Sequence, residues 1–327
     1  MKHSVCLLEA VNLALASEMR RDEEIVLLGE DIGVNGGVFR ATANLRDEFG
    51  LKRVMDTPLA ESMIAGLSIG MASQGLKPVA EIQFMGFIFP ALEQIICHAA
   101  RMRNRTRGRL TCPMVIRAPF GGGIHAPEHH SESTEALLAH IPGLKVVIPS
   151  SPARAYGLLL SAIRDPDPVL FLEPKRIYRS QQQEILDNGE ALPLGSCFTL
   201  REGSAITLIS WGAMITETLA AAEHFQNKGV HCEVIDVASI SPLDMTTILA
   251  SVKKTGRVVI VHEAPRNAGI GAEIAATIAE RALLDLQAPI ARVTGYDTVM
   301  PYFRLESHYL PNTQDIIDSI NETLEFA

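Results

Sequence analysis

The cysteines of this sequence form no cluster. There are five of them in 327 residues, an odd total, and they include no CxxC pair. This spacing argues against a disulfide framework and against a zinc knuckle, and it favours reduced thiols. We therefore expect a cytoplasmic protein.

Long apolar runs and an excess of positive charge are also missing. No stretch reaches the about 18 apolar residues that a membrane-spanning helix needs. The first residues, MKHSVCLLEAVNLALASEM, are similar to a signal peptide, but Glu9 and Asn12 interrupt the apolar run. Their spacing predicts an amphipathic first helix instead. The net charge of −9 disfavours nucleic acid and anionic membranes as main partners.

Three glycine-rich segments lack the spacing of known phosphate-binding motifs. GEDIGVNGG, FGGGIH and NAGIGAE match neither a Walker motif nor a GxGxxG fingerprint between a strand and a helix. Taken alone, each is better interpreted as a tight turn than as a phosphate site. The sequence also has no internal repeat and no low-complexity tract, so two ordinary globular domains are the expectation at this length.

Short β-branched runs alternate with helical segments along most of the chain. In the first half the strand-like runs are EIVLLGE, KPVAEIQF, PMVIRAP, LKVVIPSS and PVLFLEP. Helices are expected after DTPLAE, over PALEQIICHAARMR and from Pro152 to Ile163. The runs AITLIS, VHCEVIDVAS, RVVIVHEA and PIARV continue the pattern, separated by three helices. The alternation predicts two consecutive parallel-type α/β domains, at residues 1–177 and 204–327, joined by a polar, irregular linker at 178–203.

The segment DTPLAES contains a carboxylate without an obvious local role. If Thr57 caps a helix that begins at the next residue, Glu61 falls one position past that of a capping box. The MIAGLSIGMASQG that follows is apolar nearly all round, so we expect a buried helix that approaches another helix closely at Gly66 and Gly70. A carboxylate at the mouth of such a helix is costly unless it has a partner or a chemical task.

The segment HAPEHHSES places three histidines beside acidic residues. His125 and His129 have the spacing of zinc ligands on a helix, but Pro127 and the preceding glycines indicate a loop, and no third ligand is evident. A histidine on such a loop is suited to proton transfer near neutral pH. A plain surface role is the alternative.

Three more segments allow two interpretations each. SAIRDPDPV is either a rigid turn set by two prolines or a hard-cation site at a helix end. The aromatic residues of EIQFMGFIFP fit a protein core, whereas one of them would also suit a platform under a flat ring. The arginines of RMRNRTRGR favour a solvated helix end, with an acidic partner surface as the alternative.

Together these segments resemble one family over nearly the whole chain: the beta subunits of thiamine-diphosphate-dependent 2-oxoacid dehydrogenases, the decarboxylating components of those complexes. The segments GEDIGVNGGVFRAT, DTPLAES, EIQF, RAPFGGG, HHSES, KVVIPS, SAIRDPDPV and EAPRNAGIGAEI occur in the family's order. Within the family, the sequence is similar above all to bacterial pyruvate dehydrogenases. The resemblance implies a pyrimidine-binding α/β domain followed by a transketolase C-terminal-like α/β domain.

The resemblance also implies which residues contact the cofactor. Glu61 would hydrogen-bond a ring nitrogen of the aminopyrimidine of thiamine diphosphate and so promote the proton transfer that activates the thiazolium. Phe87, where some relatives have Tyr, would stack on the aminopyrimidine. Gln83 and Leu59 would be further walls of this pocket, and Glu30 would be a relay partner for Glu61.

His130 matches the active-site histidine of the family. It is expected to assist the substrate or the acyl transfer to lipoyl groups, so the implied catalytic residues are Glu61 and His130. The resemblance gives no role to His125 or His129.

Two metal ions follow from the resemblance. The cofactor's diphosphate binds Mg²⁺ through a GDG-type motif with a downstream Asn, and no GDG occurs in this sequence. An alpha subunit is therefore expected to hold the magnesium and the other half of the site. A potassium site of some relatives matches Ala162, Ile163, Asp165 and Asp167. The first two would bind K⁺ through their carbonyl oxygens, and Asp167 is Asn in some relatives.

The implied assembly is an α2β2 heterotetramer whose partner is a dihydrolipoyl acyltransferase core. The implied reaction is the thiamine-diphosphate-dependent oxidative decarboxylation of pyruvate, with reductive acetylation of lipoyl groups. A branched-chain 2-oxoacid or acetoin dehydrogenase is one alternative, because those members share most of the segments. A non-catalytic subunit that only assembles the complex is another.

Overall fold

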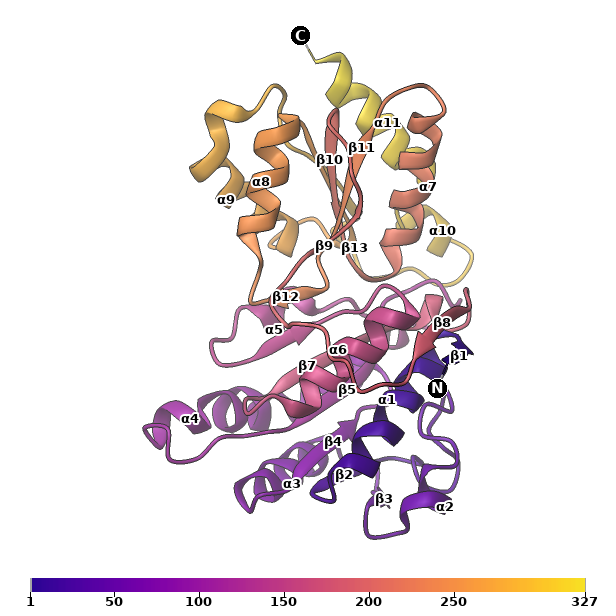
Figure 1. The fold of residues 1–327 in the computed structure, drawn as a ribbon, viewed down its shortest axis with the longest axis vertical. Coiled ribbons are helices and arrows are strands. Elements are labelled where there is room, and N and C mark those ends of the chain that lie inside the picture. The colour runs from indigo at the N-terminus through magenta and orange to yellow at the C-terminus, as the bar shows by residue number, and fades with distance from the viewer. Residues whose placement is uncertain (1, 327) are drawn as a thin grey trace. The chain divides into compact units, whose positions relative to one another are not determined.

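The computed structural model describes residues 2–326. They form two compact units, which Figure 1 shows as ribbons. The N-terminal unit contains the residues up to Phe120 together with Leu137–Leu194, and the C-terminal unit contains Gly121–Ala136 together with the residues from Gly195 onward. The loop Gly121–Ala136 therefore follows a strand of the N-terminal unit in sequence but belongs by its contacts to the C-terminal unit.

A parallel sheet is the centre of the N-terminal unit. Its strands run in the order β6, β7, β5, β4, β2, β3, and each neighbouring pair is parallel. Strands β2, β5 and β7 are buried along their whole length, as expected for a sheet that is covered on both faces. The bounds are β2 (Ile25–Gly29), β3 (Val54–Asp56), β4 (Lys77–Glu81), β5 (Val115–Phe120), β6 (Lys145–Val147) and β7 (Val169–Pro174).

Two long helices of this unit lie side by side, α1 (Leu7–Arg21) and α6 (Pro152–Arg164) (Figure 1). The amphipathic first helix is thereby confirmed. Helix α6 begins at Pro152 as predicted, because the Ser151 hydroxyl caps it by accepting a hydrogen bond from the amide of Arg154. The other helices are α2 (Leu45–Phe49), α3 (Glu61–Ser73), α4 (Met102–Arg105) and α5 (Glu135–Ala139).

The segment PALEQIICHAARMR is helical, as predicted, but it does not form one regular α-helix. The chain instead makes a 3₁₀ turn at Met85–Ala91, a π-helical turn at Gln94–His98, a 3₁₀ turn at Ala99–Arg101 and the short α4. Pro90 lies inside the first of these turns and cannot donate the amide hydrogen bond of a continuous helix.

The polar stretch 178–203, predicted as irregular, contains two short strands. β8 (Gln183–Leu186) pairs antiparallel with β1 (Lys2–Val5), and β9 (Phe198–Arg201) pairs antiparallel with β11 of the C-terminal unit. Both strands depend on partners that are distant in sequence, so local composition does not reveal them.

The sheet of the C-terminal unit has the order β14, β13, β10, β11, β9. Its four parallel strands are the predicted ones, and β9 is an antiparallel edge strand. Their bounds are β10 (Ile206–Ser210), β11 (Cys232–Asp236), β13 (Val258–Pro265) and β14 (Ala291–Gly295), and a short β12 (Ser239–Ser241) follows β11.

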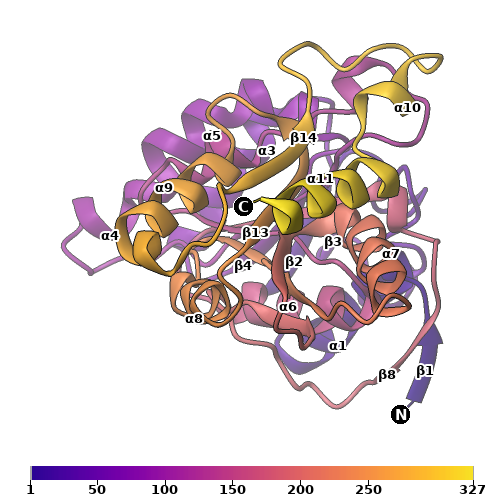
Figure 2. The same ribbon diagram turned by 90° about the horizontal axis from the view of Figure 1, so that it is seen from above.

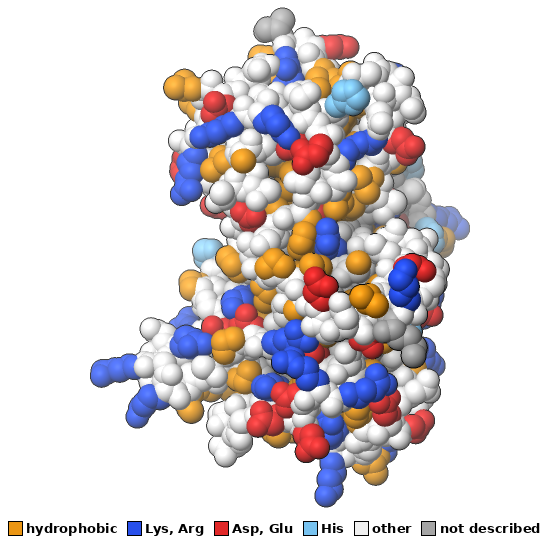
Figure 3. Space-filling view, viewed as in Figure 1, with side chains coloured by type: hydrophobic (Ala, Val, Ile, Leu, Met, Phe, Trp, Pro, Cys, Tyr) orange, Lys and Arg blue, Asp and Glu red, His pale blue; other side chains and the backbone are white. Residues whose placement is uncertain are grey.

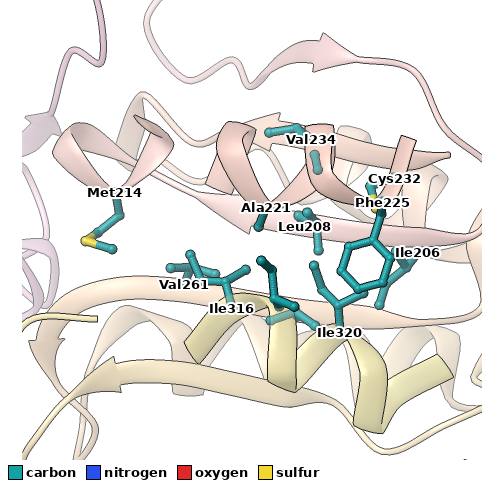
Figure 4. Close-up of a cluster of buried hydrophobic side chains, with 13 residues drawn as sticks. Ile206, Leu208, Met214, Ala221, Phe225, Cys232, Val234, Val261, Ile316 and Ile320 are labelled. Atoms are coloured by element: carbon teal, nitrogen blue, oxygen red, sulfur yellow. The ribbon is translucent and has the colours of Figure 1, made fainter. Parts of the chain in front are cut away.

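Helices cover both faces of this second sheet (Figure 2). α7 (Ile215–Gln226) and α11 (Thr313–Glu325) lie on one face, and α8 (Met245–Thr255) and α9 (Ile270–Ala282) lie on the other. The short α10 (Glu306–Tyr309) precedes α11. Between the sheet and the first pair of helices, Phe225, Ile316 and Ile320 pack on Leu208 and Val261 in one buried apolar cluster (Figure 4).

Two expectations about the environment of the chain can be compared with this fold. All five cysteines are free thiols in this fold. Across residues 2–326, no helix has both the length and the apolar character that crossing a bilayer requires.

Candidate active site

The first group of predicted site residues lies where parallel strands of the N-terminal unit end. Glu30 comes directly after β2, Glu61 follows β3 by five residues, and Gln83 follows β4 by two. The chain runs from β2 outward to β3 and then returns to the other side of β2 to form β4. Ligands of open α/β sheets bind at such a reversal, in the crevice beyond the carboxyl ends of the strands.

Glu61 is the first residue of α3, and the predicted helix start is wrong. Ala60 occupies the N-cap position, so the helix begins three residues later than a cap at Thr57 requires. The Thr57 amide is held elsewhere, because it donates a 2.9 Å hydrogen bond to the carbonyl of Gly29 at the end of β2. Glu61 thus lies half-buried at a helix N-terminus, where the helix dipole favours a carboxylate by roughly 0.3–1 kcal/mol.

The carboxylates of Glu30 and Glu61 interact. Burial raises the pKa of Glu30 above its ordinary value, and the neighbouring charges of Asp31 and Glu61 raise it further. The protonated form of Glu30 is therefore favoured relative to that of a free carboxyl group. This is the property that a proton-donating pair requires.

An aromatic wall stands beside this pair. Phe87 lies half-buried in the 3₁₀ turn after β4 and packs edge-to-face on Phe84, with ring centroids 5.6 Å apart. The hydroxyl of Ser62 donates to the carbonyl of Pro90, which ties the start of α3 to the same turn. Leu59 is 71% exposed and Gln83 is half-buried. The arrangement offers a flat, polar ring an aromatic face and a carboxylate that can hydrogen-bond its edge.

Helix α3 is not buried all round, contrary to the prediction. Ile64, Ala65 and Ser68 are buried, whereas Met63 and Leu67 are 40% and 42% exposed. Gly70 has open space where a side chain would lie. One apolar face of the helix is therefore uncovered in the isolated chain.

The predicted histidines lie in the C-terminal unit. His130 ends a 3₁₀ turn, Glu128–His130, in the loop Gly121–Ala136, and its side chain is half-buried. His129 is exposed and lies near Glu132. His125 is also exposed and contacts Glu306, with 2.9 Å between Nδ1 and Oε2. Within residues 2–326 no group of three or more His, Cys, Asp or Glu side chains could hold a metal ion, so the two exposed histidines have no third zinc ligand.

Amides of the three glycine-rich segments bind carboxylates of this chain. In the first, the amides of Gly33 and Val34 donate to Asp56. In the third, the amide of Asn267 donates to Asp297. The second belongs to the histidine loop, and its amides donate to buried glutamates. The first two segments form turns and bends as predicted, whereas the third continues from its turn into helix α9 at Ile270.

The last residues of the loop Gly121–Ala136 include a buried polar group that was not predicted from the sequence. Glu135 is fully buried, and its Oε1 accepts a 3.2 Å hydrogen bond from Trp211 Nε1. Trp211 stacks on His262 with ring centroids 5.1 Å apart. Burial raises the pKa of Glu135 to about 7 and lowers that of His262 to about 4. At neutral pH His262 is therefore largely uncharged, and Glu135 is about half protonated.

Glu135→Gln should stabilise the protein at alkaline pH more than at acidic pH. Because the folded pKa is raised from 4.5 to about 7, the stabilisation is complete below pH 4.5 and is lost as the pH rises through 7. Glutamine stays neutral, so the gain in unfolding free energy should grow by up to about 3 kcal/mol between about pH 5 and pH 8. Melting curves across this range measure it. The control is Glu184→Gln at an exposed position, and a gain that is the same at every pH would contradict the argument.

The residues matched to a potassium site lie together at the end of α6. Ala162 and Ile163 are buried in its last turn. Asp165 pairs with Lys145 at 2.5 Å, and Asp167 pairs with Arg103 at 2.7 Å. Both carboxylates thus already have a cationic partner from the chain, so a bound K⁺ would depend mainly on the carbonyl oxygens.

The arginine-rich segment is solvent-exposed. Arg101, Arg105, Arg107 and Arg109 are exposed around and beyond α4, and Figure 3 shows basic side chains projecting from that region. Arg103 is exposed as well and reaches Asp167. The prediction of a solvated helix end is confirmed.

Comparison with known proteins identifies the fold and the relatives. Two family models match the chain, the transketolase pyrimidine binding domain over residues 4–181 and the transketolase C-terminal domain over residues 195–316. Proteins named pyruvate dehydrogenase E1 component subunit beta from Staphylococcus epidermidis and Bacillus subtilis are 50% and 49% identical over 320 residues, 98% of each chain.

A solved structure described as "Split gene transketolase, inactive beta4 tetramer" matches with a TM-score of 0.80 over 99% of both chains. At 22% identity this likeness establishes the fold alone. The predicted succession of a pyrimidine-binding and a transketolase C-terminal-like fold is confirmed. The chain belongs to the family of pyruvate dehydrogenase E1 component beta subunits, which is built from these two transketolase domains.

Proposed function

We propose that the chain is the beta subunit of a pyruvate dehydrogenase, the component that oxidatively decarboxylates pyruvate and acetylates the lipoyl groups of an acyltransferase. The observation that carries the proposal is the interacting pair Glu30 and Glu61, placed at the strand reversal beside the aromatic wall of Phe87. The near full-length relatives named for pyruvate support the choice of substrate.

Thiamine diphosphate fits the residues of this crevice. Phe87 offers its face to the aminopyrimidine, Gln83 and Leu59 line the same edge, and Glu61 can hydrogen-bond a ring nitrogen. When bound, the cofactor supplies an electron sink for the bond between the carboxylate and the keto carbon of the substrate. The task of Glu61 is to hold and donate a proton at the ring nitrogen, with Glu30 keeping that proton in the pair.

An alpha subunit would complete the site. The chain contains no GDG motif for the Mg²⁺ of the cofactor's diphosphate, so we assign the metal to the partner. The uncovered face of α3, with Met63 and Leu67 exposed and Gly70 open, suits close helix packing across that subunit interface. The proposed assembly is an α2β2 heterotetramer.

His130 is the proposed second catalytic residue. It would donate a proton to the substrate or assist acyl transfer to the lipoyl group of the acyltransferase core, since imidazole exchanges protons near neutral pH. The proposed domain limits are 1–177 and 204–327, with the linker at 178–203. The proposed location is the cytoplasm, and K⁺ at Ala162, Ile163, Asp165 and Asp167 remains part of the proposal.

Substrate comparison tests the function. The chain, combined with its alpha subunit, thiamine diphosphate and Mg²⁺, should reduce an artificial electron acceptor with pyruvate at a kcat/KM at least about 10-fold above that with 3-methyl-2-oxobutanoate. A difference of that size needs about 1.4 kcal/mol, which a hydrophobic pocket can supply between substrates that differ by methyl groups. The reverse preference would favour the branched-chain alternative. No activity with either 2-oxoacid or with acetoin would favour a subunit that only assembles the complex.

A further inference from the structure

The loop that bears His130 is closed at its base by one carboxylate of the C-terminal unit. Oε1 of Glu263, in β13, accepts hydrogen bonds from the amide of Gly122 at 3.1 Å and from the Ser133 hydroxyl at 2.8 Å. Beside it, the amide of Gly121 donates to the carbonyl of Glu132 at 3.0 Å. The two ends of the loop are thus joined through Glu263, whose side chain is only 4% exposed.

A second carboxylate holds the first arm of the loop. Oε1 of Glu306, at the start of α10, accepts from the amide of Gly123 at 2.7 Å, and its Oε2 accepts from the amide of His125 at 2.9 Å. Oε2 also lies 2.9 Å from Nδ1 of His125. Glu306 is 2% exposed, so both of its oxygens depend on the loop for hydrogen bonds.

The glycines of FGGGIH allow the loop to approach these carboxylates closely. A side chain at Gly121 would collide with the carboxylate of Glu263, and Gly121 and Gly123 have φ values of +82° and +85°. The amides that could form an anion-binding nest are therefore occupied by two carboxylates of the same unit.

We propose that Glu263 and Glu306 are positioning residues that hold the histidine loop in the conformation in which His130 can act. His130 lies within residues 1–177, the range predicted for the first domain. Through Glu263 and Glu306, the C-terminal unit nevertheless sets its activity. The inference rests on the proposed function for the role of His130. The fixing of the loop itself does not depend on that function.

The geometry predicts different outcomes for the two glutamine variants. Glu263 uses a single oxygen for both of its hydrogen bonds, so the amide oxygen of Glu263→Gln can replace it, whereas Glu263→Ala removes the link. Glu306 accepts with both oxygens, so in Glu306→Gln the amide NH₂ would face a donor. Glu306→Gln and Glu263→Ala should therefore release the loop, and Glu263→Gln should largely retain it.

Hydrogen exchange of the full chain bound to its alpha subunit tests loop order. The amide of Gly122 in Glu263→Ala, and that of Gly123 or His125 in Glu306→Gln, should exchange at least about 10-fold faster, because each loses its acceptor. The amides of β10 and β11 should be unchanged. The matched control is Glu233→Gln, which alters another buried glutamate of the same unit that binds Lys254 and the amide of Gly203.

Steady-state kinetics tests the consequence for His130. The two loop-releasing variants should lose about 10- to 100-fold in kcat, because a displacement of about 1 Å can cost that much. The KM for thiamine diphosphate should be unchanged, because Glu61 and Phe87 belong to the other unit, and Glu263→Gln should recover most of the activity. Unchanged exchange, or equal losses in the two glutamine variants, would overturn the proposal. A wild-type complex that is inactive on 2-oxoacids would refute the proposed function instead. The exchange rates would then still test whether Glu263 and Glu306 fix the conformation of the loop.

Discussion

Glu61→Gln should lower the 2-oxoacid-dependent kcat by about 10²- to 10⁴-fold, the range in which general acid–base groups contribute. Glutamine has nearly the shape of glutamate and can still hydrogen-bond a ring nitrogen, but it has no proton to give. The Glu30–Glu61 interaction also disappears, so the charge that helps to raise the pKa of Glu30 is removed. Binding of the cofactor should therefore survive better than turnover.

The helix dipole needs a separate control, since Glu61 also interacts with the N-terminus of α3. Glu273 is a first-turn glutamate of α9 that is exposed and distant in sequence from every proposed site residue. Glu273→Gln should lose the same few tenths of a kcal/mol of helix stability with no effect on kcat. Dye reduction by the reconstituted complex measures both variants. If Glu61→Gln retains activity within about twofold of wild type, Glu61 is not the proton donor.

Glu61 stood out in the sequence as a candidate site residue, but the start of its helix could not be predicted. Counting positions after Thr57 showed that Glu61 does not fit a capping box, and this result held although α3 begins later than expected. The helix start was wrong because the Thr57 amide binds the carbonyl of Gly29, and this tertiary contact outweighs the local Thr-Pro signal. The strand pattern was recovered well, because buried parallel strands are continuous apolar runs.

The contacts that organise the second half of the candidate site could not be predicted. Gly122 and Glu263 are 141 positions apart, and Gly123 and Glu306 are 183 apart. No periodicity connects residues at such distances, so the glycine run indicated a turn without its acceptors. The assignment of the histidine loop to the C-terminal unit was missed for the same reason.

A buried ionic cluster in the N-terminal unit was missed as well, although the sequence contained a signal. Glu81, Arg117 and Glu173 are charged residues inside strands that are otherwise apolar, on the neighbours β4, β5 and β7. Charged side chains at such positions must find partners, because an isolated buried charge is too costly.

Arg117 is the centre of that cluster. Its Nε and Nη2 donate to the two oxygens of Glu173 at 2.6 and 3.0 Å, and its Nη1 donates to Glu81 at 2.9 Å. The Tyr178 hydroxyl donates to Glu173 at 2.6 Å. Burial opposes the charge on Arg117, but the two carboxylates hold its pKa above the ordinary value. None of the three charged side chains is more than 5% exposed.

Arg117→Met should reduce the free energy of unfolding by about 3–5 kcal/mol, because it leaves two carboxylates buried without a cation. The matched control is Arg20→Met, which breaks the exposed pair with Glu48 and should cost less than about 1 kcal/mol. Urea unfolding followed by circular dichroism measures both. Trp211 is the only tryptophan and lies in the C-terminal unit, so its fluorescence shows whether the loss extends beyond the N-terminal unit.

The variant Glu81→Gln/Arg117→Met/Glu173→Gln distinguishes two causes of the stability loss in Arg117→Met. One is the loss of the ion pairs, and the other is the burial of two carboxylates without a cation. If the cost of Arg117→Met comes from the two carboxylates left without a partner, neutralising them should recover at least about half of it, although no ion pair is restored. If the ion pairs themselves provided the stability, the triple variant would be at least as unstable as Arg117→Met. Recovery would mean that the cluster acts mainly by fixing β4, β5 and β7 in register. The register of β4 in turn sets the position of Gln83 and Phe87, which follow it in the chain.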